Sequence, residues 1–339
     1  MLTFTLRRCL TAIPTLLFIA FVIFIILEAA PGDPLSDQPL TIPAYVREQM
    51  RAALGLDQAW YIRFYLWLYQ FFVVEPCTLW GYLSGWTAEA SRATCGDRVV
   101  SWQFRSPVMD IIVQRMPQTL WVVGMAYVVG VLIAIPIGII SAVRQYSVTD
   151  QVGNFVSMIG FSFPTFFTGN LLIVIFAVQL GWLPSIYDTQ LRVTDWATFG
   201  QQLRQMAMPV AVLALFNASQ ISRYMRAAML DNLTQDYVRT ARAKGMTERV
   251  VVLRHVLRNS MIPVVTVIAL GVPTVFGGAI ITEQVFKVNG LGQLLIVAIH
   301  SNDLPMVQTL TFMFAVLIVL FNLIADIMYG ILDPRIRYD

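Results

Sequence analysis

The residues best suited to chemistry are cations gathered in one stretch of the chain. Eight arginine and lysine residues lie between positions 223 and 258, against three acidic residues. Guanidinium and ammonium groups at neutral pH bind carboxylates and phosphates through charge-assisted hydrogen bonds. The chemistry that this stretch offers is therefore docking, either onto an acidic protein surface or onto anionic lipid.

Residues for catalysis are scarce. The two histidines, His255 and His300, are separated by an apolar stretch, which argues against a histidine-based metal cluster within the chain. No phosphate-binding Gly-x-x-x-x-Gly-Lys-Ser/Thr run and no Gly-x-Ser-x-Gly nucleophile run occurs, and the lysines are Lys244 and Lys287. We expect a chain that is not an enzyme, that binds no metal or cofactor, and that hydrolyses no ATP by itself.

The composition places these residues in a membrane protein. Hydrophobic residues make up 57% of the chain and charged residues 13%, whereas a soluble domain carries roughly 25% charged residues. We predict an all-α, polytopic fold with six transmembrane helices, each about 20 residues long. The predicted apolar stretches are 9–27, 117–142, 152–180, 207–230, 261–281 and 305–332. A kink or close packing against a neighbouring helix is expected at the prolines and glycines inside two of these stretches, which are Pro164 and Gly169 in the third and Gly271, Pro273, Gly277 and Gly278 in the fifth.

Charge asymmetry predicts the orientation. Arg7 and Arg8 precede the first span, Arg144 lies in the second loop, and the cation-rich stretch follows the fourth span. In a six-span chain all of these fall on the same side, which the positive-inside rule makes the cytoplasm. The predicted divisions are a transmembrane helix in 1–30, an outward segment in 31–116 and a five-helix core in 117–339.

Start and stop signals predict a short helix near 234–246 within the cation-rich stretch. Thr234 can cap its start, Arg242 and Lys244 occupy its last turn, and Gly245 stands where a left-handed residue is needed. A second start follows at Thr247 and Glu248. The result is a helix, a turn and a helix in a cytoplasmic loop, with a solvated basic loop as the simpler interpretation.

Runs along nearly the whole chain resemble one family. They include DYVRTARAKG at 236–245, HVLRNSMIPVVT at 255–266, LRR at 6–8, IPT at 13–15, PGDP at 31–34, ALGLD at 53–57, RMPQTL at 115–120 and DPRIR at 333–337. These runs are similar to permease subunits of the dipeptide, oligopeptide and nickel branch of ABC importers, and most to B-type subunits of dipeptide permeases. Against the general importer signature, only Ala241, Gly245 and Leu257 match literally, a variant that suits the peptide branch.

The resemblance implies a type I importer permease whose cytoplasmic coupling helix docks on an ATPase subunit. Coupling residues would be Tyr237, Val238, Arg239, Ala241, Arg242, Lys244 and Gly245. The cations among them would pair with acidic groove residues, while Tyr237, Val238 and Ala241 would offer an apolar contact. The implied partners are a homologous C-type permease, two ATPases that bind ATP and magnesium, and a periplasmic binding protein, in the bacterial inner membrane. Membrane lipid surrounds the spans, and no nucleic acid is expected.

The substrate and two rival functions stay open. Di- and oligopeptides fit the resemblance best, with nickel chelates or oligosaccharides as alternatives. An ion-coupled secondary transporter needs ionisable residues inside the membrane; Asp326 is the main candidate, and we expect it to pair with a cytoplasmic arginine instead. A passive channel would need a filter-like motif, which is lacking. Pathway lining is predicted for Thr266, Gly271, Thr274 and Gly278, with helix packing as an equal alternative.

The outward segment predicts three further features. An amphipathic helix is expected at 44–56, and the aromatic stretch 60–72 suits the membrane interface. Residues 75–95 resemble an insertion, flanked by Cys77 and Cys95. In an oxidising periplasm a disulfide would close this loop of about 19 residues and stabilise it by about 3 kcal/mol. It would present Trp80, Tyr82 and Trp86 to the binding protein or the pathway mouth, unless the segment is a passive elaboration.

Overall fold

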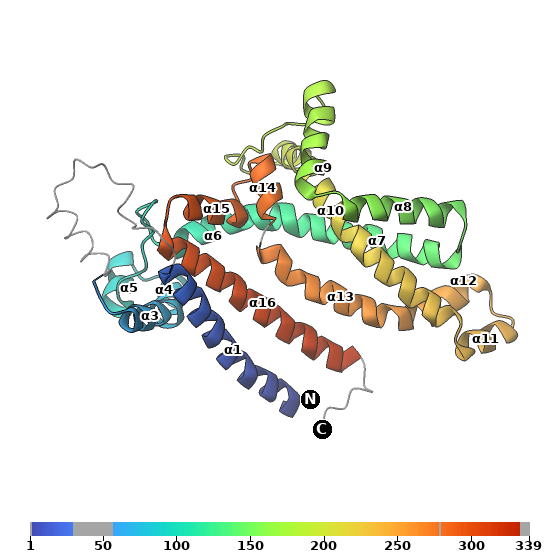
Figure 1. The fold of residues 1–339 in the computed structure, drawn as a ribbon, viewed down its shortest axis with the longest axis horizontal. Helices are drawn as coiled ribbons and strands as arrows, with labels where there is room; N and C mark the ends of the chain where they lie inside the picture. Colours follow the sequence, from blue (N-terminus) through green and yellow to red (C-terminus); the bar gives the residue numbers. More distant parts are fainter. Residues whose placement is uncertain (1, 30–56, 278, 333–339) are drawn as a thin grey trace. The chain divides into compact units, whose positions relative to one another are not determined.

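The computed structural model describes residues 2–29, 57–277 and 279–332, and in this part of the chain every regular element is a helix (Figure 1). The predicted turn at 31–34, the predicted helix at 44–56 and the ending at 333–337 lie outside the described residues. The all-α prediction is confirmed. By its internal contacts the chain forms two compact units.

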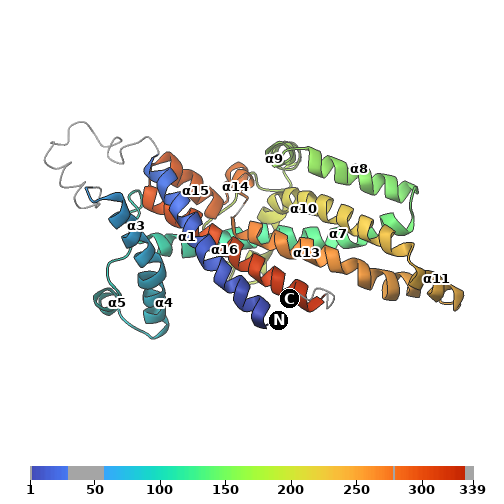
Figure 2. The same ribbon diagram turned by 60° about the horizontal axis from the view of Figure 1, so that its bottom comes forward.

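The first unit comprises Met1–Cys9, Met116–Gln293 and Leu317–Asp339. Its elements include α7 (Met125–Val143), α8 (Val148–Ser162), α9 (Thr165–Leu172), η3 (Ile173–Gln179), α10 (Trp196–Leu233), α11 (Asp236–Ala243), α12 (Glu248–Val250), η4 (Val251–Val256), α13 (Leu257–Gly277) and α14 (Ile280–Phe286). Helices α7, α10 and α13 lie side by side (Figures 1 and 2). A β-carbon at Gly138 of α7 would stand 2.8 Å from the Ser222 carbonyl oxygen of α10, so a small residue lets the two backbones approach.

The second unit comprises Leu10–Arg115 and Leu294–Val316. Its elements include α3 (Trp60–Tyr69), η1 (Gln70–Val74), α4 (Glu75–Leu83) and α5 (Ala88–Cys95). Helices α1 (Leu2–Glu28), α6 (Val108–Thr119), α15 (Leu291–His300) and α16 (Leu304–Leu332) each contribute residues to both units. The unit's core gathers Ala20, Phe24, Trp67 and Phe312.

Asp303 fixes one turn of the second unit. Its buried carboxylate accepts backbone hydrogen bonds from Trp102 and Gln103, at 3.2 and 3.3 Å, and a side-chain bond from Ser101. It also accepts from the Met306 amide at the start of α16. One carboxylate thus satisfies the donors of a turn and of a helix N-terminus, which would otherwise be costly to bury.

Four helices in the described residues are long and apolar enough to cross a membrane: Arg7–Glu28, Val108–Val143, Glu248–Pro273 and Leu304–Ile327. The pair Val148–Ser162 and Thr165–Gln179 is a fifth span if counted as one, although it bends by 104° (Figure 2). The bend follows from Pro164, because the residue before a proline is driven out of the helical region and Phe163 is extended. The predicted kink is confirmed.

Two predicted spans differ from the structure. The second begins at Val108 instead of 117, because the helix extends through Arg115 and Pro117 beyond the apolar run. The fourth, 207–230, lies within the 38-residue α10, which is long enough to cross a membrane but is not among the four apolar spans. Its last turns carry Arg223 and Arg226. The six-span count stays a prediction.

Candidate functional site

The helix predicted in the cation-rich stretch is α11, and its start differs from the prediction. The Thr234 hydroxyl donates to the Asp231 carbonyl at 3.0 Å, and Thr234 itself is helical. It therefore ends α10 instead of capping α11. Gln235, which is extended, occupies the N-cap position without a side-chain hydrogen bond. Thr247 precedes α12 at the position predicted for the second start.

Gly245 ends α11 as predicted. Its φ is +75°, in the left-handed region. The Gly245 amide donates to the Arg242 carbonyl at 2.9 Å and the Met246 amide to the Ala241 carbonyl at 3.4 Å. These two bonds form a Schellman motif, which satisfies carbonyls that a helix end otherwise leaves unpaired.

The apolar side of α11 faces the chain itself. Val238 is 0% exposed and Ala241 is 5% exposed. They pack in a core with Met225 and Met229 of α10 and with residues of η4. Val238 and Ala241 were predicted to offer an apolar contact to a partner, and the structure corrects this prediction. In the 8-residue α11, both side chains pack against α10 and η4 of the chain itself.

Some polar side chains of α11 bond to other residues of the chain, and others remain exposed. Arg242 donates to both carboxylate oxygens of Glu248, at 2.6 and 3.1 Å, and this raises the pKa of the Arg242 guanidinium. Arg242 thus ties α11 to α12. The Tyr237 hydroxyl donates to Asn232 at 2.7 Å, while Arg239 lies 3.5 Å from Asp236 and remains highly exposed.

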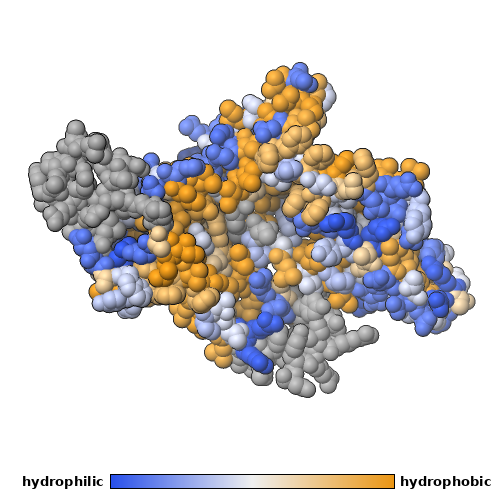
Figure 3. Space-filling view, in the orientation of Figure 1, coloured by the Kyte–Doolittle hydropathy of each residue, from blue (hydrophilic) through white to orange (hydrophobic). Residues whose placement is uncertain are grey.

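Lys244 and three arginines that follow it extend this surface. Lys244, Arg249, Arg254 and Arg258 are all exposed. Hydrophilic residues gather over α11 and α12 at the right edge of the space-filling view, whereas hydrophobic residues cover α9 at its top (Figure 3). This basic surface can bind an acidic surface through its exposed cations, which no carboxylate of the described residues fully neutralises.

An ion pair between α8 and α10, with a buried carboxylate and a partly exposed arginine, was not indicated by the sequence. Arg226 of α10 donates two parallel hydrogen bonds to Asp150 of α8, at 2.9 and 3.0 Å. Asp150 is 2% exposed and also accepts from the Tyr146 amide and from Asn154. The available signal was Ser147, whose hydroxyl caps α8 by accepting from the Asp150 amide and so directs Asp150 into the first turn.

The structure describes the side-chain surroundings of two of the four predicted pathway residues, and pathway lining stays a prediction. The Thr266 hydroxyl donates to the Ile262 carbonyl of its own helix. Gly271 lies against Tyr127, where a β-carbon would overlap the phenol oxygen, so close packing explains this glycine. The side chain of Thr274 and all of Gly278 lie outside the described residues.

Two charged residues near the ends of spans have partners. Asp326 forms an ion pair with Arg8 at 3.3 Å, which confirms the predicted pairing with an arginine, while its cytoplasmic location stays a prediction. The Arg223 guanidinium lies 4.6 Å from the centre of the Phe161 ring. Within the described residues no group of three or more His, Cys, Asp or Glu side chains could hold a metal ion.

The segment predicted to face outward contains a disulfide between Cys77 of α4 and Cys95 of α5, with 5.7 Å between the α-carbons. Trp80, Tyr82 and Trp86 are exposed beside it. The structure thus brings together the two predicted cysteines and presents the three predicted aromatic residues on the surface.

The disulfide predicts a chemical result. When thiols of the folded, non-reduced protein are blocked and the protein is digested, we expect a linked Cys77 and Cys95 peptide pair and alkylation at Cys9. The Cys77→Ser, Cys95→Ser double variant should lose about 3 kcal/mol of stability in this segment because a loop of this length is released. Protease digestion of the segment measures that loss. Alkylation of both cysteines in the folded protein would contradict the disulfide.

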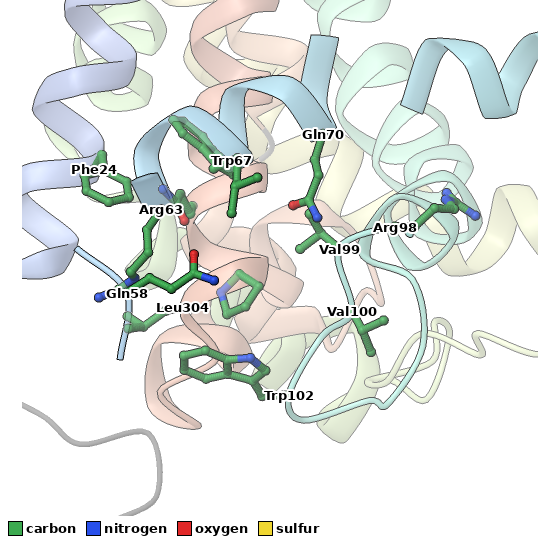
Figure 4. Close-up of a pocket in the computed structure, with 13 residues that line it drawn as sticks. Phe24, Gln58, Arg63, Trp67, Gln70, Arg98, Val99, Val100, Trp102 and Leu304 are labelled. Carbon is green, nitrogen blue, oxygen red and sulfur yellow. The ribbon is translucent and has the colours of Figure 1, made fainter. Parts of the chain in front are cut away.

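A cavity of about 380 Å³ lies in the second unit (Figure 4). Arg63, Trp67 and Gln70 enter it from successive turns of one helix, and Trp102 lies opposite. Both arginines in its wall are already neutralised. Arg63 donates to Glu28 at 2.8 Å, and Arg98 donates to Glu75 and Asp110, each at 2.8 Å. Neither arginine in the cavity wall is therefore left unpaired to bind an anion.

Comparison with known proteins adds the following. Residues 134–338 match the model of the family "Binding-protein-dependent transport system inner membrane component", and residues 1–123 match the N-terminal model of such membrane components. The chain is 36% identical over 343 residues to the oligopeptide transport system permease protein AppB of Bacillus subtilis, covering 100% of both chains. It is 36% identical over 340 residues to the glutathione transport system permease protein GsiC of Escherichia coli K12, again covering 100% of both. An inward-facing structure of the MetNI methionine ABC transporter shares the fold with a TM-score of 0.53 at 20% identity, over 66% of this chain and 97% of that one.

Proposed function

The chain belongs to the family of inner membrane components of binding-protein-dependent transport systems, and from this premise we propose that it is the permease subunit of an ATP-driven ABC importer for di- or oligopeptides. It is a membrane protein with several apolar spans. The full-length similarity to two permeases named for oligopeptides and for glutathione supports a peptide substrate over nickel chelates or oligosaccharides.

The observation that carries this function is the way α11 is held. Its apolar side packs on α10 and η4, its end is fixed by the motif at Gly245, and Arg242 ties it to α12. Helices α10 and α13 continue from this point into the helical core. A displacement of α11 would therefore move both helices, because packed side chains transmit displacement.

The partners belong to the proposal. The exposed cations Arg239 and Lys244 would face a cytoplasmic ATPase, of which two copies bind ATP and magnesium. A homologous C-type permease would complete the pathway, and a periplasmic binding protein would deliver the peptide. Both termini and α11 would then lie in the cytoplasm of a bacterial cell, and Cys77 and Cys95 in the periplasm.

The energy source separates this proposal from an ion-coupled transporter. Asp326 and Arg8 are both partly exposed, so the pair contributes at most about 1 kcal/mol. We expect Asp326→Asn to leave uptake into proteoliposomes dependent on ATP and close to the wild-type rate, with Arg8→Gln as the matched variant. Uptake driven by a proton or sodium gradient without ATP, abolished by Asp326→Asn, would contradict the proposal.

A further inference from the structure

Elements α3, η1 and α4 form one continuous helix, residues 60–83, with two different faces. The inward face repeats at helical spacing through Phe64, Trp67, Phe71, Val74 and Thr78, which are buried or half-buried. The outward face is apolar and aromatic along its whole length. Its exposed residues are Tyr61, Ile62, Tyr65, Leu66, Tyr69, Phe72, Val73, Leu79, Trp80 and Leu83.

The two charged residues of this helix avoid the outward face. Arg63 and Glu75 are the only charged residues in 60–83, a range that the structure describes in full. Their side chains are 22% and 10% exposed. Each is neutralised from the inward side, Arg63 by Glu28 and Glu75 by Arg98. A helix facing water shows the reverse pattern, with its charges outward.

The outward face is continuous with the exposed surface of a membrane span. The inward face of α3 packs on the last turns of α1, where Phe64 lies 5.2 Å from Phe24 between ring centres. Phe21 of α1 is itself exposed and lies 6.4 Å from Trp60 and 5.8 Å from Phe64. The contacts lie between Ala20 and Glu28, within about 12 Å of the end of α1 at 1.5 Å per residue.

The side-chain types fit the boundary between acyl chains and headgroups. Three tyrosines, Tyr61, Tyr65 and Tyr69, recur every fourth residue, and Trp80 follows on the same helix. Tyr and Trp are enriched at membrane interfaces, where an apolar ring with a polar tip meets both environments. A large exposed apolar patch on a soluble surface would instead promote association.

We propose that the outward face of residues 60–83 lies in the interface of the lipid bilayer, as an extension of the lipid-facing surface of α1. The disulfide between Cys77 and Cys95 joins the second half of this helix to the hydrophilic α5, which stands away from the lipid. In this proposal, lipid covers the outward face of residues 60–83. The segment that carries Trp86 and Glu89 is exposed to water.

Spin-label accessibility in the assembled transporter, reconstituted in phospholipid nanodiscs, tests this. In a Cys9→Ser background a single label is placed by Tyr65→Cys or Leu79→Cys on the outward face, and by Glu89→Cys on α5 as the control. Collisions with oxygen, which concentrates in lipid, are compared with collisions with a water-soluble nickel chelate. We expect the ratio of oxygen to nickel-chelate collisions to be severalfold higher at 65 and 79 than at 89.

Two outcomes would overturn the proposal. Equal ratios at the three positions would place the face in water. Labels at 65 and 79 that neither reagent reaches, in the presence or absence of the binding protein, would show that another protein chain covers the face. A higher ratio of oxygen to nickel-chelate collisions at 65 and 79 than at 89 would support the lipid contact even in a complex that transports poorly, since the ratio does not depend on transport.

Discussion

Asp150→Ala is expected to lower the stability of the protein by about 3 kcal/mol, because it leaves the partly buried Arg226 side chain without its carboxylate. The side chain of Arg226 is 24% exposed, so water relieves only part of the loss. The variant also removes the acceptor of the Tyr146 amide and of Asn154. Thermal unfolding of the purified complex in detergent measures the effect.

Two matched variants separate the ion pair from its surroundings. Asn154→Ala removes one hydrogen bond to the same carboxylate and should cost only about 1 kcal/mol. The double variant Asp150→Asn, Arg226→Met keeps an acceptor for the Tyr146 amide but buries no charge, and it should recover much of the stability lost in Asp150→Ala. An unfolding temperature for Asp150→Ala equal to that of Asn154→Ala would show that the pair is unimportant.

Gly245→Val is expected to reduce transport and transport-linked ATP hydrolysis. A left-handed conformation costs a side chain with a branched β-carbon about 1–2 kcal/mol, which corresponds to a factor of about 5–30 in the population of the correctly ended helix. A β-carbon at 245 would meet no atom within 4 Å, so the effect would come from the backbone and not from a steric clash.

Gly245→Asn is the matched control for this prediction. Asparagine tolerates the left-handed region and also ends helices, so this variant should stay close to wild type. Both variants are compared for ATP hydrolysis stimulated by the loaded binding protein and for copurification of the ATPase subunits. Normal stimulated hydrolysis in Gly245→Val would mean that the position of α11 does not govern coupling.

Local signals in the sequence predicted local geometry well. Pro164 predicted the break between α8 and α9, and Gly245 predicted the end of α11. Proline narrows and glycine widens the range of allowed backbone dihedral angles, whatever residues surround them. The pairing of Asp326 with an arginine followed from its place near the end of a span, whereas the sequence did not single out Arg8. Thr234 was misassigned because a threonine between two helices can serve either one, and only the chain path decides which.

Contacts between distant residues were beyond the sequence. Asp150 and Arg226 are 76 positions apart, so neither residue alone indicated a buried pair. Val238 and Ala241 had the spacing of an apolar contact, but the spacing does not say whether a partner or the chain itself supplies the other side. The aromatic stretch 60–72 favoured the membrane interface, which stays a proposal, whereas the inward orientation of Arg63 and Glu75 required the structure.

Uptake of a radiolabelled di- or tripeptide into proteoliposomes tests the central claim most directly. The vesicles would contain this chain, its C-type partner and the two ATPases, with the binding protein outside and ATP and magnesium inside. We predict that intact peptide accumulates against its gradient. This accumulation should require hydrolysable ATP inside the vesicles, and excess unlabelled peptide should inhibit it. Peptide accumulation without ATP, or ATP-dependent accumulation of a nickel chelate or an oligosaccharide but no peptide, would contradict the assignment.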